Sequence, residues 1–184
     1  MRLLDNVKKY SDLGRLAVVC DGEKLTYKEL DEMSDSMATY LINEFGQDKS
    51  PIVIYGNKDN LILVLMLAAL KSGRAYVPLD VTFPIERVKQ VINEVEAKVV
   101  INFTEENLEA SYSKSDIEGI IKSNKSHFVS RENWVKDNEN AYILFTSGST
   151  GKPKGVQISK NNLDSFNDWF GKYTDHNFGV SDYR

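Results

Sequence analysis

A loop of small polar residues follows a short apolar segment in the stretch AYILFTSGSTGKPKGV, residues 141–156. Glycine lets a backbone approach a ligand and turn its N–H groups inward, and the glycines here are Gly148, Gly151 and Gly155. Hydroxyl donors are supplied by Thr146, Ser147, Ser149 and Thr150. Lys152 and Lys154 add positive charge. The combination predicts a binding site for a polyphosphate.

The loop differs from the common GxxxxGK[ST] phosphate-binding motif. Only two residues separate Gly148 from Gly151, and Pro153 stands where that motif has the Ser or Thr that binds Mg²⁺. Pro153 also lacks a backbone N–H. Because strand-like segments lie on both sides, a solvated turn of a β-hairpin is the second interpretation. The residues alone favour phosphate binding over that turn.

Strand-like and helix-like segments alternate around the loop. Two short strands are expected on either side of a turn at Asp21 and Gly22. Apolar runs typical of strands buried on both faces occur at 51–55, 75–80, 97–103 and 141–145, and a further strand is expected at 155–159. This alternation predicts an α/β fold, with a mainly parallel sheet flanked by helices.

Start and stop signals mark the expected helices. Thr26 and Glu29 form a capping box at the start of one helix. An apolar helix at 59–72 is expected to end at Gly73. Other helices are expected with Pro84 at the first helical position, at 105–108, at 115–123 and after a capping Ser159.

The composition is typical of an ordinary globular protein, with 41% hydrophobic residues, 27% charged residues and a net charge of -4. The negative charge argues against a nucleic-acid-binding surface. No signal peptide is apparent, and the longest apolar run, 61–70, is too short to span a membrane. The single cysteine, Cys20, excludes an internal disulfide, and we expect a buried, inert residue rather than a catalytic thiol. These features predict a cytoplasmic protein.

The histidines and tryptophans give no sign of a functional site. His127 and His176 have no cysteine or carboxylate at metal-ligand spacing, so we expect surface residues and no metal site. Trp134 and Trp169 are expected to be packing residues rather than binding platforms.

Three segments together resemble the adenylate-forming superfamily, which includes acyl-CoA synthetases, luciferases and peptide-synthetase adenylation domains. YILFTSGSTGKPKGV resembles its phosphate-binding signature, and LTYKEL and LKSGRAYVPLD resemble the first two core motifs of adenylation domains. PIVIYG, YVPLDVTFPIERVKQVIN and GSTGKPKGVQIS are similar to the D-alanine–D-alanyl carrier protein ligase branch. The resemblance implies that residues 1–184 form part of the large N-terminal domain of an AMP-binding adenylation enzyme.

Enzymes of this superfamily join a carboxylate to the α-phosphate of ATP and then transfer the acyl group to a thiol. The resemblance implies ATP and Mg²⁺ as cofactors, a small amino acid such as D-alanine as substrate, and a carrier protein with phosphopantetheine as partner. An acyl-CoA synthetase or peptide-synthetase domain with another acid remains the alternative. A non-catalytic module that pairs through an open sheet edge is a third possibility.

The resemblance also implies roles for residues of the loop. Thr146 and Ser147 would contact ATP most directly, and Lys154 would neutralise the departing pyrophosphate. The residues that would close over the β- and γ-phosphates are Gly148, Ser149, Thr150 and Gly151. Asp80, at the end of the second core motif, is a candidate to face the active site. Both earlier core motifs are otherwise expected to be structural.

Full members of the superfamily are much longer than this sequence. No segment here resembles their adenine motif, their ribose-binding aspartate, their acyl pocket or their small C-terminal domain with its catalytic lysine. We therefore expect a fragment that is inactive alone and that exposes apolar surface, which favours self-association.

Overall fold

The computed structural model describes residues 1–124, 128–146 and 153–177, with side chains up to Lys172. A six-stranded sheet lies at its centre in the order β6–β5–β3–β4–β7–β8. All pairs are parallel except β7 and β8, which confirms the expected mainly parallel sheet. The strands are β3 (Ile52–Tyr55), β4 (Tyr76–Leu79), β5 (Val99–Asn102), β6 (Tyr112–Ser113), β7 (Asn140–Thr146) and β8 (Lys154–Ser159).

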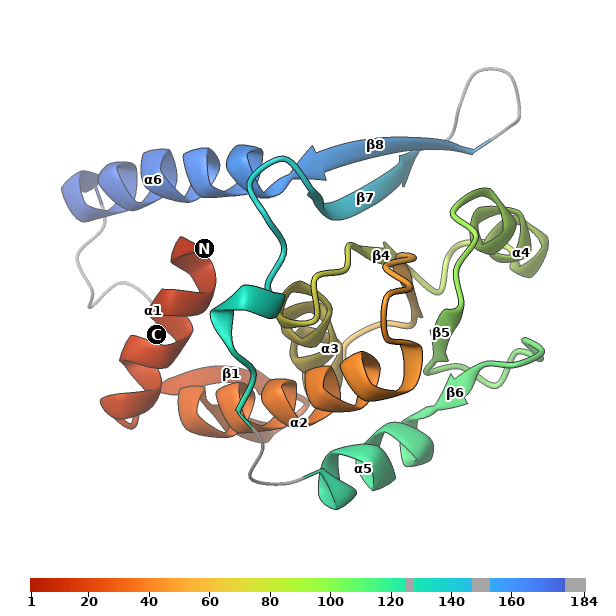
Figure 1. The fold of residues 1–184 in the computed structure, drawn as a ribbon, viewed down its shortest axis with the longest axis horizontal. Helices are drawn as coiled ribbons and strands as arrows, with labels where there is room; N and C mark the ends of the chain where they lie inside the picture. The colour runs from red at the N-terminus through yellow and green to blue at the C-terminus, as the bar shows by residue number, and fades with distance from the viewer. Residues whose placement is uncertain (125–127, 147–152, 178–184) are drawn as a thin grey trace.

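Helices cover both faces of the sheet, and a small antiparallel pair, β1 (Leu16–Cys20) and β2 (Glu23–Thr26), lies outside it. The helices are α1 (Arg2–Asp12), α2 (Tyr27–Phe45), α3 (Asn60–Lys71), α4 (Ile85–Glu94), α5 (Lys114–Ser123) and α6 (Lys160–Asn177). In Figure 1, α4 stands apart from the group formed by α1, α2, α3 and α5. No helix in the described part of the chain is long and apolar enough to cross a membrane.

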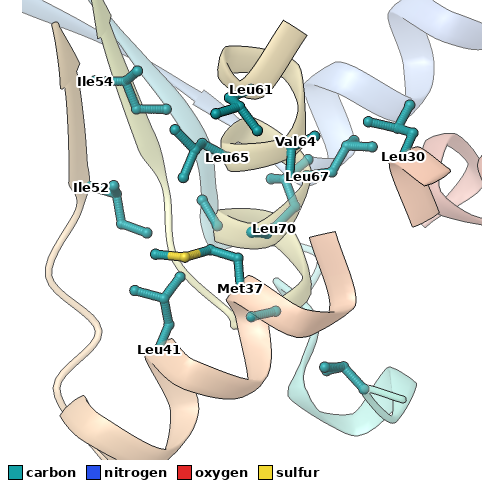
Figure 2. Close-up of a cluster of buried hydrophobic side chains, with 14 of the residues drawn as sticks. Leu30, Met37, Leu41, Ile52, Ile54, Leu61, Val64, Leu65, Leu67 and Leu70 are labelled. Atoms are coloured by element: carbon teal, nitrogen blue, oxygen red, sulfur yellow. The ribbon is translucent and has the colours of Figure 1, made fainter. Parts of the chain in front are cut away.

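Alternate residues of the central strands form two separate cores. Ile52 and Ile54 of β3 pack with α2 and α3, and Figure 2 shows Met37 and Leu65 directed toward them. The intervening Val53 joins a second cluster, in which Val88 and Val91 of α4 are buried. The period of two along each strand therefore places α4 on the opposite face from α3.

Local signals predicted several helix ends correctly. Thr26 and Glu29 form the expected capping box at α2, and Ser159 accepts a hydrogen bond from the backbone N–H of Asn162 at 3.2 Å at the start of α6. Gly73, with φ of +74°, follows α3 as expected, and a Cβ atom there would lie 2.7 Å from the carbonyl oxygen of Asn133. Pro84 differs from the prediction, because its ψ of 140° is extended and makes it the N-cap of α4 rather than its first residue.

The expected helix at 105–108 is wrong, whereas the one at 115–123 corresponds to α5. The side chain of Asn102 accepts a hydrogen bond from the backbone N–H of Thr104 at 2.9 Å and donates to the carbonyl of Glu106 at 2.7 Å. These bonds hold the chain in a loop and compete with helix formation. The short strand β6 was not predicted.

Two expectations about single side chains also differ from the structure. Cys20 is partly exposed rather than buried, because the β1–β2 pair lies outside the main sheet, and its thiol donates to the carbonyl of Lys58 at 3.1 Å. Trp134 is buried as expected, but Trp169 is 59% exposed on α6. His127 and the side chain of His176 lie outside the described residues.

Candidate nucleotide site

The β7–β8 hairpin brings the two ends of the glycine-rich loop together. Thr146, the last residue of β7, lies directly opposite Lys154, the first residue of β8, and both are exposed. Ser147, Gly148, Ser149, Thr150, Gly151 and Lys152 lie outside the described residues. The structure thus pairs the residue at which the loop begins with a lysine just after the loop, on neighbouring strands.

This end of the hairpin lies at the carboxyl edge of the parallel strands. The strands β3, β4 and β7 are neighbours, and residues at or near their carboxyl ends, Gly56, Asp80 and Phe145, line one cavity of about 360 Å³. Ligands of open α/β sheets bind outside the carboxyl ends of the strands. The location of Thr146 therefore agrees with a ligand site at this edge.

The cavity combines an apolar wall with a few polar groups. Its apolar residues include Ile54, Ile62, Met66, Phe83 and Leu144, and its polar residues are Asn57, Lys58 and Asp80. Small-molecule sites typically have this composition.

Asp80, which the sequence made a candidate to face the active site, lines this cavity. Its carboxylate accepts a hydrogen bond from the backbone N–H of Thr82 at 2.9 Å. This hydrogen bond lowers the pKa of Asp80 below its ordinary value, so the side chain is a carboxylate at neutral pH.

Gly155 serves the packing of the hairpin. A Cβ atom at this position would lie 2.9 Å from Cγ2 of Ile143 and 3.0 Å from Cζ of Phe145. Both contacts are on the neighbouring strand β7, so the absence of a side chain allows β8 to cover these two residues. The sequence grouped Gly155 with the glycines that approach a ligand, and the described contacts show that it also has a packing role in the hairpin.

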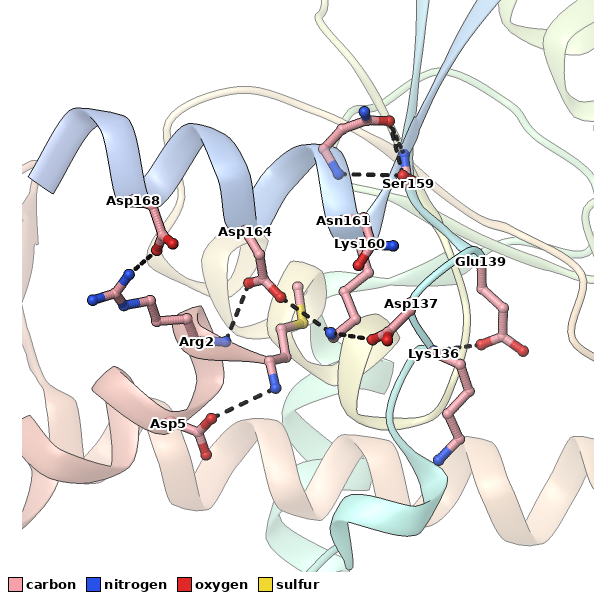
Figure 3. A network of polar contacts seen from close by, with 12 residues as sticks. Arg2, Asp5, Lys136, Asp137, Glu139, Ser159, Lys160, Asn161, Asp164 and Asp168 are labelled. Carbon is pink, nitrogen blue, oxygen red and sulfur yellow. Dashed lines mark hydrogen bonds and ion pairs between the residues drawn. The ribbon is translucent and has the colours of Figure 1, made fainter.

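A polar network joins the far end of β8 to the rest of the molecule (Figure 3). Lys160, the first residue of α6, contacts Asp137 at 2.5 Å and Asp164 at 3.1 Å. The hydrogen bond to Asp137 is the main reason that the pKa of Lys160 is raised. Asp164 also accepts from the backbone N–H of Arg2 at 3.1 Å. The helix that follows the hairpin is therefore held against both α1 and the segment before β7.

Sequence reasoning missed one residue at the hairpin. Nη2 of Arg87, from α4, donates a hydrogen bond to the carbonyl of Thr146 at 2.7 Å. Arg87 lies in the segment YVPLDVTFPIERVKQVIN, but no local pattern in that segment gave it a role, because the contact depends on how α4 packs on the sheet.

The described residues contain no group of three or more His, Cys, Asp or Glu side chains that could hold a metal ion. A Mg²⁺ ion that arrives with a nucleotide needs few protein ligands, because it keeps several waters and binds the phosphates.

A family model described as "AMP-binding enzyme" matches residues 5–182 of the chain. The chain belongs to the AMP-binding enzyme family. This confirms the resemblance drawn from the loop and the two core motifs.

Curated relatives of the family are also similar to this chain. It is 36% identical over 173 residues to a D-alanine–D-alanyl carrier protein ligase of Bacillus licheniformis, a match that covers 92% of this chain and 34% of the relative. A protein of the same name from Listeria monocytogenes is 41% identical over 156 residues, with 80% and 30% covered. The chain thus spans about a third of the length of these relatives.

Solved structures with the same fold are also similar to this chain. Apo MatB from Rhodopseudomonas palustris matches with a TM-score of 0.79 and 22% identity, over 93% of this chain and 37% of MatB. The N-terminal subdomain of Klebsiella oxytoca NpsA, in complex with 3-hydroxybenzoyl-AMSN, matches with a TM-score of 0.71 and 26% identity, over 86% and 40%.

Proposed function

We propose that this chain is the nucleotide-binding part of an ATP-dependent ligase that activates a carboxylate, D-alanine, as an acyl-adenylate. The observation that carries the proposal is the pairing of Thr146 with Lys154 at the carboxyl edge of the sheet, in a chain of the AMP-binding family. The choice of D-alanine rests on the names of the relatives from Bacillus licheniformis and Listeria monocytogenes.

In the proposed reaction, a carboxylate oxygen attacks the α-phosphorus of ATP and the bond to the β-phosphate oxygen breaks. Negative charge grows on the departing pyrophosphate, and fixed hydrogen-bond donors and cations stabilise such charge. We assign this role to the ammonium of Lys154 and the hydroxyl of Thr146. The remaining proposed ATP contacts are Ser147, Gly148, Ser149, Thr150 and Gly151.

In the second step, the thiol sulfur of a carrier-bound phosphopantetheine attacks the acyl carbonyl carbon, and AMP leaves with the bonding electron pair. We place both steps in the cytoplasm, where ATP is available. We propose that Mg²⁺ enters with ATP and screens the phosphate charge. Residues 1–184 would form part of the large N-terminal domain, and the groups that read the adenine, the ribose and the acid would lie outside them.

The test is ATP–pyrophosphate exchange by the protein at its native length, with D-alanine, L-alanine and a fatty acid offered separately. Exchange with D-alanine is expected, and it should disappear when Mg²⁺ is chelated. Replacing Thr146 or Lys154 by alanine should lower kcat by about 10²–10³, the usual cost of one transition-state donor.

The matched control is Lys89→Ala, because Lys89 is an exposed lysine that contacts Glu86 at 3.0 Å on the surface of α4. Its exchange rate should equal that of the unmodified protein. Unchanged exchange in both the Thr146 and the Lys154 variants would refute the assignment of the loop, and exchange with a fatty acid alone would refute the choice of substrate.

A further inference from the structure

We propose that Arg87 is a positioning residue that fixes the peptide group of Thr146, and so the end of β7, at the candidate nucleotide site. The inference rests on the proposed function, since it concerns the same site. It adds a residue of α4, which packs on the face of the sheet opposite α3. Arg87 lies outside the phosphate-binding signature and the two core motifs, although the longer segment YVPLDVTFPIERVKQVIN contains it.

The contact joins two elements that are far apart in the chain. Nη2 of Arg87 donates to the carbonyl oxygen of Thr146 at 2.7 Å, within the range of a strong hydrogen bond. Figure 1 shows α4 beside the end of the sheet toward which the β7–β8 hairpin extends. A hydrogen bond to a carbonyl oxygen restrains the orientation of the whole planar peptide group.

The guanidinium group is itself held in place. It lies over the ring of Phe83, with 5.4 Å from Cζ to the ring centroid, and this ring packs against the second core. The next turns of α4 are anchored by Val88 and Val91, which are fully buried. Arginine suits such a site because its planar group stacks on an aromatic ring while its N–H groups donate in fixed directions.

The Nε atom of Arg87 is shielded from solvent and has no hydrogen-bond partner among the described residues. A buried donor without an acceptor usually costs about 1–3 kcal/mol. The contact with Thr146 does not use this donor, because that hydrogen bond is made by Nη2. The position of Arg87 near Thr146 and Lys154 places a third positive or donor group at the edge proposed for phosphate binding.

Two variants of the protein at its native length test the proposal. Arg87→Met keeps the aliphatic part of the side chain but removes every donor, whereas Arg87→Lys retains one cation that can reach the carbonyl. The control is Lys89→Met, two residues further along the same helix, where the lysine contacts only Glu86 in the described structure.

The first measurement is hydrogen–deuterium exchange without nucleotide. Peptides that cover 140–146 should exchange faster in Arg87→Met than in the control, while peptides from α3 and β3 should not change. The second is ATP–pyrophosphate exchange, in which Arg87→Met should lower kcat/KM for ATP about 10²-fold, the cost typical of a misplaced group. Arg87→Lys should recover part of that loss.

If Arg87→Met changes neither the hydrogen–deuterium exchange at 140–146 nor kcat/KM for ATP, the proposal is overturned. Faster hydrogen–deuterium exchange throughout α4, β3 and β4 in Arg87→Met would also overturn it, because Arg87 would then be a general stabilising residue. If the unmodified protein shows no ATP–pyrophosphate exchange, the proposed function fails, whereas the hydrogen–deuterium measurement still decides whether Arg87 positions Thr146.

Discussion

The Nζ atom of Lys71 lies 2.6 Å from Oδ1 of Asp31, at a position where the lysine side chain is only 2% exposed. Asp35 contacts the same ammonium group at 2.8 Å. Both carboxylates come from α2 and the lysine comes from α3, so one buried positive charge holds the two helices together.

Replacing Lys71 by methionine is expected to lower the free energy of unfolding by about 3–5 kcal/mol, because it leaves buried carboxylates without their cation. Urea denaturation measures this loss. Lys89→Met, at an exposed pair, should change stability by less than about 0.5 kcal/mol. Similar stability of the Lys71→Met and Lys89→Met variants would show that the carboxylates of Asp31 and Asp35 do not need the Lys71 ammonium for the fold to be stable.

The stability difference between Asp35→Asn and the unmodified protein should depend on pH. Burial raises the pKa of Asp35 above its ordinary value of 3.8, although Lys71 opposes the shift. The folded form therefore favours the protonated side chain, and this contribution to stability is lost as pH rises through the folded pKa. Asparagine cannot ionise, so the variant should gain stability relative to the unmodified protein as the pH rises from about 4 to about 7.

All other titrating groups are common to the two proteins, so their contributions cancel in the difference to first order. Urea denaturation at each pH gives the free energies of unfolding of both. A difference that stays constant over this range, or that favours the unmodified protein as the pH rises, would contradict the raised pKa.

The capping box of α2 allows a third test of stability. Thr26 accepts a hydrogen bond from the backbone N–H of Glu29 at 3.2 Å, and Glu29 accepts one from the backbone N–H of Thr26 at 2.8 Å. Thr26→Ala should cost about 0.5–2 kcal/mol, whereas Thr26→Ser should retain most of the stability because it keeps the hydroxyl oxygen. Equal losses of stability in Thr26→Ala and Thr26→Ser would show that the methyl group of Thr26, rather than its capping hydroxyl, stabilises the protein.

The sequence predicted the helix ends at Thr26 and Gly73 but not the contacts of Arg87 and Lys71, and both outcomes have one physical cause. A capping box and an apolar period depend on residues within a few positions of each other, so Thr26 and Gly73 were interpretable without the fold. The contact of Arg87 with Thr146 and that of Lys71 with Asp31 depend on how helices pack, which no local pattern encodes. The failure at 105–108 has a different cause, because the side chain of Asn102 forms local hydrogen bonds that hold these residues in a loop.

The candidate site shows the same division. The sequence favoured a phosphate loop for residues 141–156 and kept the turn of a β-hairpin as the alternative, and the structure contains a hairpin with Thr146 opposite Lys154. It could not predict that β3, β4 and β7 would be neighbours, because strand order is set by tertiary packing. The cavity beside Asp80 follows from that order.

The same substitution at two glycines should have opposite effects. Gly155→Ala places a methyl group 2.9 Å from Ile143, and such overpacking typically costs about 1–3 kcal/mol. Gly119 lies in α5 with no atom within 4 Å of a built Cβ, so Gly119→Ala should raise stability by about 0.5–1 kcal/mol through helix propensity. Thermal unfolding of both variants checks the signs, and a stabilising Gly155→Ala would refute the packing role.

An aromatic patch on α6 predicts how the isolated chain of residues 1–184 behaves. Phe166, Trp169 and Phe170 are 55%, 59% and 45% exposed, and the ring centroid of Phe166 lies 5.9 Å from that of each of the other two. Contiguous exposed aromatic surface favours association, because contact between two copies removes it from water. We expect the chain to form dimers or larger species in light scattering, increasingly at higher concentration.

Replacing Phe166 and Phe170 by serine should shift the chain toward the monomer, because the substitutions remove two of the three exposed rings of the patch. The matched control is Phe128→Ser, since Phe128 is 66% exposed at a separate position, with the ammonium of Lys8 over its ring. That variant should associate as the unmodified chain does. A monodisperse monomer of the unmodified chain at high concentration would show instead that the patch on α6 does not cause association.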